Sequence, residues 1–295
     1  MAFAAAVLNT IIRMAWSARL VPMVLACGAA FATSASAAGD PRVVVDRPAD
    51  YPGIQHLHYE YGPIAVTPGQ NSIVFRPNVL KPQVPGYITR FKPDLIYADH
   101  KRGVPRVDVI HLHHGVWIIN GQPQFAAGEE KTITNVPQGF GVHHDPRDNW
   151  IMNYMVHNLT PNADSVYITY DIDFVPDGAP AAATMRPAFI TWLDVAGISA
   201  YPVFDAQRGW GTKGVYRFPE QARGAQRARI GSARTWTPGK DITLLAMAGH
   251  LHPGGLANEL YDRRGGVERK LFRSDAVYFE PAGAVSWDVA MTATP

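Results

Sequence analysis

Cysteine is almost absent from this chain of 295 residues, which contains one cysteine and eleven histidines. A single cysteine cannot form an internal disulfide, and it supplies no thiolate cluster for a structural metal site. An excess of one charge is also lacking, because 27 basic residues face 25 acidic ones and the formal net charge is +2. Such a chain has no overall basic field to attract phosphates, so we expect no nucleic-acid partner.

Two common catalytic motifs are missing as well, namely a glycine-rich nucleotide loop and a Gly-x-Ser-x-Gly elbow. The composition is nevertheless that of a folded protein, since 47% of the residues are hydrophobic and 11% are aromatic. With no thiolates and many histidines, metal chemistry becomes the best lead. Imidazole-rich sites suit copper, zinc, iron or nickel, and a thioether ligand would favour Cu(I).

The first 38 residues contain no acidic residue and only two charged ones, both arginine. A short apolar run follows the arginines and leads into an Ala-x-Ala site at Ala35 and Ala37. This order predicts that residues 1–38 are a signal peptide removed on export to the periplasm or the extracellular space, with an uncleaved anchor as the alternative. The residues around Cys27 partly resemble a lipoprotein cleavage box, so lipid anchoring is a further alternative. We expect an exported protein without stable membrane association.

Alternation of apolar and polar residues dominates the chain after residue 40 and predicts strands. The clearest cases are residues 166–174 and 285–291, whereas only residues 219–229 have a helical pattern. Gly/Pro turn signals recur between these segments, for example in Pro85–Tyr87 and Gly121–Pro123. Many short strands with such turns predict an all-β protein built from antiparallel β-sandwich or jelly-roll domains.

A segment low in bulky residues and interrupted by two prolines, Val175–Thr184, is the best candidate for a domain boundary. It divides the mature chain into residues 39–177 and 178–295, each of ordinary domain size. One large sandwich with a long surface loop is the alternative. We therefore expect two tandem β-sandwich domains.

Nine of the eleven histidines fall into four short groups. Residues i and i+2 of a strand point to the same face, so a His-x-His pair can present two imidazoles to one metal. His250 and His252 fit this pattern and precede a Pro-Gly-Gly turn, which predicts a pair near a strand end. His111 and His113 share a face by the same reasoning, and His114 points the other way unless the strand bulges or ends there. Burying several imidazoles without partners is costly, which favours ligand roles in this group.

The remaining histidines have more ordinary interpretations. His56 and His58 precede a tyrosine-rich strand, and we expect both to lie at the surface. We expect the same of His143 and His144, which the sequence places in a polar loop, while His100 follows an aspartate near a turn.

The order of three histidine motifs along the chain resembles a known family. His113 and His114 come first, His157 follows in a Val-His-Asn strand, and His250-x-His252 lies in the second half. This order resembles the copper type II, ascorbate-dependent monooxygenases, the group of the peptidylglycine α-hydroxylating and dopamine β-monooxygenases. Three segments resemble exported bacterial-type members most closely: Tyr61–Asn71, Asn153–Thr160 and Gly249–Gly255.

The resemblance implies two jelly-roll-like domains, each holding one copper ion. It also implies hydroxylation of a C–H bond of a small-molecule substrate with O2, with ascorbate as the electron donor. The first copper would have only histidine ligands and would take up electrons, and the second would bind O2 through two catalytic histidines and a methionine. The implied ligands are His113, His114 and His157 for the first copper, and His250, His252 and Met291 for the second.

The chain departs from the family pattern in three respects. The family's disulfides are absent, and Ala248 stands where the peptide-hydroxylating members have an arginine that binds the substrate carboxylate, which argues against a C-terminal glycine peptide as the substrate. Met291 is the single methionine among the 43 residues after His252, and packing in a core is an alternative role for it. Since the chain ends soon after this strand, we expect a second domain that is truncated, has lost its thioether ligand and is poorly active.

Three other functions fit the same residues. The first is a non-catalytic exported copper-binding protein that uses the same histidines. The second is a zinc hydrolase built on His250, His252 and a carboxylate such as Glu259 or Asp262. The third is a β-sandwich binding module in which the histidines have no role.

Overall fold

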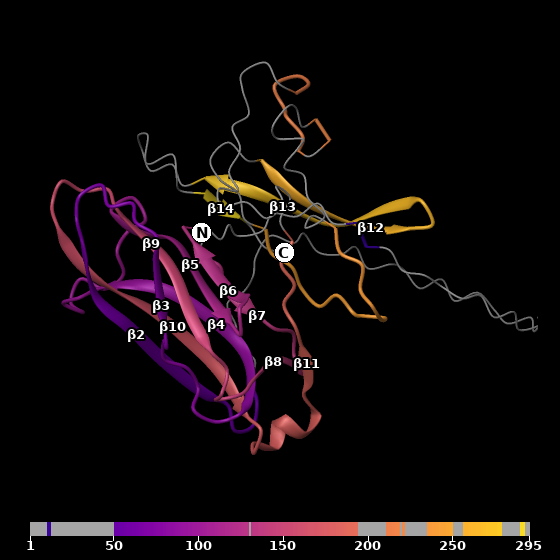
Figure 1. Cartoon of the computed structure of the whole chain (residues 1–295), viewed down its shortest axis with the longest axis horizontal. Helices are drawn as coiled ribbons and strands as arrows, with labels where there is room; N and C mark the ends of the chain where they lie inside the picture. Colours follow the sequence, from indigo (N-terminus) through magenta and orange to yellow (C-terminus); the bar gives the residue numbers. More distant parts are fainter. Residues whose placement is uncertain are drawn as a thin grey trace, which may run out of the picture.

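The computed structural model describes residues 11–12, 50–129, 131–193, 211–218, 220–221, 235–249, 256–278 and 290–292. The regular structure in these segments is β-strand apart from one short 3-10 helix, so the expected all-β class is confirmed (Figure 1). The elements are β1 (Ile11–Ile12), β2 (Gln55–Val66), β3 (Val74–Pro77), β4 (Gly86–Tyr97), β5 (Ile110–Ile119), β6 (Gln122–Gly128), β7 (Thr134–Asn135), β8 (Phe140–His144), β9 (Trp150–Asn158), β10 (Asp164–Pro176), η1 (Pro180–Thr184), β11 (Arg186–Ala188), β12 (Ala257–Arg264), β13 (Val267–Tyr278) and β14 (Ala290–Thr292).

Two sheets form a sandwich between residues 55 and 188 (Figure 1). One has the strand order β11-β8-β4-β10-β2, with β7 pairing to β4, and the other has the order β3-β9-β5-β6. A shared core of apolar side chains from both sheets lies between them. Its largest fully buried members include Trp117, Trp150, Tyr170, Phe91 and Phe125. Burial of this aromatic surface is the main force that holds the two sheets together.

The central strand β10 follows the sequence pattern closely. Val166, Ile168, Tyr170, Ile172 and Phe174 are each at most 1% exposed and belong to the core of the sandwich. The strand pairs antiparallel with β2 on one side and with β4 on the other. The prediction of a strand over residues 166–174 is therefore confirmed.

Strands β5 and β6 form a tight hairpin. Ile119 pairs with Gln122, so only Asn120 and Gly121 make the turn, and their φ angles are 51° and 79°. Two consecutive positive φ angles define the type I′ turn, whose twist matches that of the flanking strands. The turn signal at Gly121–Pro123 thus marks a hairpin. The signal at Pro85–Tyr87 is wrong as a turn prediction, because β4 begins at Gly86.

The expected domain boundary remains a prediction. The segment 175–184 contains the end of β10 and all of η1. Beyond residue 177, β11 still pairs with β8 in the first sandwich. A separate sheet has the order β1-β12-β13-β14, in which β12 and β13 form an antiparallel hairpin and β1 pairs parallel to β12.

Two expected elements fall largely outside the described residues, namely the helix over 219–229 and most of the strand over 285–291. Among the residues that the structure does describe, no helix has the length and hydrophobicity that a membrane span requires.

Candidate metal centre

Three histidines from two neighbouring strands converge on one point. His111 and His113 belong to β5, and His157 lies on β9 directly opposite His111 in the strand register. One ring nitrogen from each of the three histidines lies within 4.8 Å of the chosen ring nitrogens of the other two, a spacing that could hold one metal ion. His111 is 2% exposed and His157 is 8% exposed, while the side chain of His113 is 15% exposed. We call these residues the three-histidine cluster.

A β-bulge in β5 brings the histidines of this strand to one face. The pairing with β9 shifts between Leu112 and His114, so that His113 is the extra residue. Before the shift the even-numbered residues Ile110 and Leu112 face the core of the sandwich, whereas after it the odd-numbered Trp117 does. The bulge thus exchanges the residues that face the core and those that face away from it. A bulge of this kind re-aims side chains at functional sites. Both His113 and His114 consequently lie with His111 on the face directed away from the core.

His114 nevertheless lies beside the cluster and not in it. Its Nε2–H donates a hydrogen bond of 2.8 Å to the amide oxygen of Asn153, which is completely buried on β9. The ring centroids of His113 and His114 are 5.8 Å apart. The structure thus brings together two of the three ligands expected for the first copper, His113 and His157. The third member of the cluster is His111 and not His114.

Hydrogen bonds orient the two histidines of β5. The Nδ1–H of His111 donates to the carbonyl of Val107 over 2.6 Å, and this carbonyl can only accept. The neutral ring of His111 therefore carries its lone pair on Nε2. The Nδ1–H of His113 donates to the carboxylate of Glu129. Metal-binding histidines commonly donate their second ring N–H to a carbonyl or a carboxylate, which fixes the tautomer.

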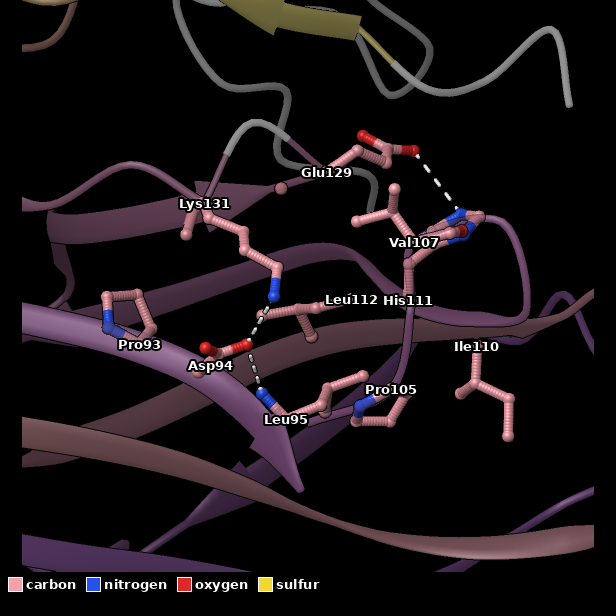
Figure 2. A pocket seen from close by; sticks show the side chains of 12 residues that line it. Pro93, Asp94, Leu95, Pro105, Val107, Ile110, His111, Leu112, Glu129 and Lys131 are labelled. Atoms are coloured by element: carbon pink, nitrogen blue, oxygen red, sulfur yellow. Dashed lines mark hydrogen bonds and ion pairs between the residues drawn. The ribbon is translucent and has the colours of Figure 1, made fainter. Parts of the chain in front are cut away.

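Glu129 supplies a buried negative charge at this place. Its side chain is 4% exposed, and its Oε1 lies 3.6 Å from Nε2 of His111. Figure 2 marks this contact with a dashed line. Sequence reasoning missed this residue. Counting back from the Asn-Gly turn pairs His114 with Ala127, but a register shift between Trp117 and Ile118 makes Gly128 its partner, so Glu129 follows opposite the histidines. A buried carboxylate is costly unless it is paired or lies near a cation.

A small pocket with room for about one water molecule lies beside the cluster. His111 and Glu129 form part of its wall, and Lys131 and Asp94 stand at another side, where they make an ion pair of 2.9 Å (Figure 2). Lys131 is paired with Asp94, whereas among the described residues the carboxylate of Glu129 lies beside the imidazoles. A carboxylate in this place favours a cation.

The ligands expected for the second copper cannot be compared with the structure. His250 and His252 lie outside the described residues. Met291 is in β14, where its backbone pairs with Val277, but its side chain lies outside the described part.

The two carboxylates considered for a zinc hydrolase lie on β12. Glu259 accepts hydrogen bonds from Lys270, Tyr261 and Arg273. Partial burial alone would raise the pKa of Glu259, but these hydrogen bonds outweigh it and lower the pKa to about 2. Asp262 is 7% exposed and forms an ion pair of 2.8 Å with Arg264. Both carboxylates thus already have cationic partners.

The exposure of the other histidines is as expected with one exception, His144. His56 and His58 are exposed but lie within β2, and His143 is exposed but lies on β8 and not in a loop. His100 lies in a turn, as predicted. His144 was expected in a surface loop, and this is wrong. It belongs to β8 with its side chain 1% exposed, and burial lowers its pKa despite a hydrogen bond to the carbonyl of Pro82. Side chains alternate between the two faces of a strand, so His144 points inward where its neighbour His143 points outward.

Comparisons with known proteins do not extend this description. No protein-family model matches the chain, and no curated protein matches it.

Proposed function

We propose that this protein is a copper-dependent monooxygenase in which His111, His113 and His157 hold the copper ion that takes up electrons. The observation that carries the proposal is the convergence of three imidazoles from β5 and β9 beside the carboxylate of Glu129. Three neutral nitrogens and no thiolate form a donor set that suits copper and zinc. The affinity order of divalent ions places Cu²⁺ above Zn²⁺ for such a set.

The reaction class rests on the resemblance of the histidine motifs. Bound copper would supply one-electron chemistry, taking electrons from ascorbate for the hydroxylation of a C–H bond with O2. In this proposal His250 and His252, with Met291 as the candidate thioether ligand, would hold a second copper ion that supplies the O2 chemistry. Export through residues 1–38 would bring the protein to an oxidising compartment. The substrate is a small molecule.

The chain's own groups have defined roles in this proposal. Val107 and Glu129 orient His111 and His113 through their Nδ1 atoms. The negative charge of Glu129 offsets part of the charge of the bound ion. Burial of the cluster keeps bulk water away, which strengthens each of these electrostatic interactions.

Metal analysis of the full-length protein tests the copper site. We expect the variant His157→Ala to bind one copper ion fewer than the wild type, or to bind it more than about 100-fold more weakly, since loss of an outer partner alone costs 10- to 100-fold. The matched control is His143→Asn, which alters an exposed histidine on β8 and should leave copper binding unchanged. Equal copper content and affinity in the wild type and His157→Ala would rule out the site.

Electron uptake distinguishes the monooxygenase from a non-catalytic copper-binding protein. One observation favours this alternative: all three histidines of the cluster come from a single sandwich, so this copper ion could be bound without the second site. We expect ascorbate to abolish the electron paramagnetic resonance signal of the bound Cu(II) and to support O2 uptake. Copper that binds tightly but stays oxidised in excess ascorbate would support the alternative and overturn the enzymatic proposal.

A further inference from the structure

We propose that β2 is the contact surface between two copies of this chain, which pair edge to edge around a two-fold axis. β2 lies at one end of its sheet and pairs with β10 alone among the described strands. Figure 1 shows it along the outer edge of the sandwich. The backbone N–H and C=O groups of such an edge can pair with a further strand. This sheet does not contain the three-histidine cluster, and the inference does not depend on the proposed function.

The length and regularity of β2 distinguish it from the other edges of the sandwich. β2 has 12 residues, whereas β11 and β3 have three and four, and each of the two contains a proline, which cannot donate a backbone hydrogen bond. β6, the fourth edge strand, has seven residues with a proline at its second position. The part of β2 from Gln55 to Tyr61 is free of proline and pairs with β10 without a register shift. Short or proline-containing edges resist pairing, so β2 is the edge best able to accept another strand.

The outer face of β2 is complementary to itself in charge. His58 and Glu60 are two residues apart and point to the same face. When two copies pair antiparallel around Tyr59, His58 of each copy lies opposite Glu60 of the other, at the spacing of about 5 Å that separates facing side chains. Within one strand, Oε1 of Glu60 is already 3.2 Å from Nε2 of His58. The two copies thus arrange four side chains so that each has an opposite charge beside it and another across from it.

The same charges select one register. Moving the two-fold axis from Tyr59 to His58 sets the two His58 side chains against each other, and moving it to Glu60 sets the two carboxylates together. With the axis at Tyr59, His56 lies opposite Gly62 and meets no like charge from the other copy. Charged side chains on an edge strand usually prevent unspecific pairing, and here they also define the arrangement that is favourable.

A hydrogen bond to the neighbouring strand favours the positive charge of His58. Its Nδ1–H donates to Oδ1 of Asp171 on β10 over 2.6 Å. This hydrogen bond raises the pKa of His58 in spite of partial burial, and Glu60 raises it further. Nδ1 of His100 also lies 3.7 Å from Oε1 of Glu60. Because the two oxygens of a carboxylate can accept several hydrogen bonds, this contact leaves room for His58 of a second copy.

The inner face of β2 gains apolar contacts in the same register. Leu57, Tyr59 and Tyr61 are half-buried and pack at the margin of the core. Pairing around Tyr59 places this residue opposite its own copy and Leu57 opposite Tyr61. The ring of Tyr59 stacks on Tyr170 with 5.2 Å between the centroids, which holds it in place at the edge of the sheet. Cross-strand aromatic pairs stabilise antiparallel sheets, so both faces of β2 favour the same pairing.

Sedimentation velocity of the full-length protein over a range of concentrations tests the pairing. We expect the wild type to pass from monomer to dimer as its concentration rises. In Glu60→Lys a lysine faces His58 twice across the axis, and we expect the dissociation constant of the dimer to rise at least about tenfold. The double variant His58→Glu/Glu60→Lys exchanges the two charges and should recover most of the lost affinity. The matched control is Asp177→Lys, because Asp177 is an exposed carboxylate 3.2 Å from the exposed His143 on β8.

Hydrogen–deuterium exchange shows whether the strands themselves pair. Exchange of the backbone amides between residues 55 and 61 should slow as the wild type dimerises, and should not slow in Glu60→Lys at the same concentration. A wild type that stays monomeric up to about 1 mM would overturn the proposal, and so would a dimer whose dissociation constant is unchanged in Glu60→Lys. Failure of the folded double variant to recover affinity would also overturn it. If the double variant does not fold, the exchange of residues 55 to 61 in the wild type decides.

Discussion

Glu129 is the residue that most strongly shapes the charge of the three-histidine cluster. It is a nearly fully buried carboxylate that accepts a hydrogen bond from His113 and lies 3.6 Å from Nε2 of His111. Such an outer partner determines both the orientation of the ligand and the net charge of the metal site. The histidines were visible in the sequence as a compact group, whereas Glu129 depended on a strand register that residue types alone do not define.

Two substitutions at Glu129 separate its charge from its hydrogen bond. Glu129→Gln keeps an oxygen that accepts from His113 but removes the charge, and Glu129→Ala removes both. We expect copper affinity to fall by about 10- to 100-fold in Glu129→Ala and by less in Glu129→Gln. Competition titration with a copper chelator measures this, and Asp177→Ala, which removes the partner of the exposed His143, is the control. Equal affinities in the wild type and Glu129→Ala would show that the carboxylate has no role in the site.

At the scale of the element, the β5 bulge determines which histidines can meet. Alternation predicted that His111 and His113 share a face, and the structure places both in the cluster. The alternation could not predict that the strand bulges at His113, because the bulge depends on pairing with β9, which is distant in sequence. Strands such as β10 were predictable because their burial repeats every second residue. The bulged strand β5 was not predictable in this way, and it is the strand that contributes two of the three histidines to the cluster.

Gly115 offers a direct test of the bulge. A Cβ at this position would lie 2.9 Å from Cδ2 of Leu112 and 3.2 Å from the ring of Trp117, both in the core. We expect Gly115→Ala to lower the free energy of unfolding by about 1–3 kcal/mol through overpacking, and to weaken copper binding because β5 must shift. Gly178→Ala is the control, since no atom lies within 4 Å of the position that its Cβ would take and its φ angle is not positive. Urea unfolding of both variants provides the measurement, and equal stability of the two would refute this explanation of the bulge.

At the scale of the whole molecule, the three-histidine cluster joins two central strands of one sheet on the face opposite the core. The core of the sandwich is apolar and rich in aromatic residues, while the outer face of β5 and β9 carries three histidines, beside the buried carboxylate of Glu129 that follows β6. The sheet therefore combines a face stabilised by packing with a face whose imidazoles and carboxylate are best stabilised by a cation. A metal ion at the cluster would hold β5 and β9 together in the folded state only, which couples metal binding to folding.

This coupling predicts that copper stabilises the protein by mass action. At a free copper concentration 100-fold above the dissociation constant, the free energy of unfolding should rise by about 2.7 kcal/mol, and by less if unfolded histidines also bind the ion. Urea unfolding with and without copper measures the change. In His157→Ala the part of this increase that comes from the cluster should disappear, because one strand no longer contributes a ligand, whereas His143→Asn should retain the full increase. If copper raised the stability of the wild type and His157→Ala equally, the stabilising ion would have to bind elsewhere on the chain, and the cluster would lose its role as the link between the two strands.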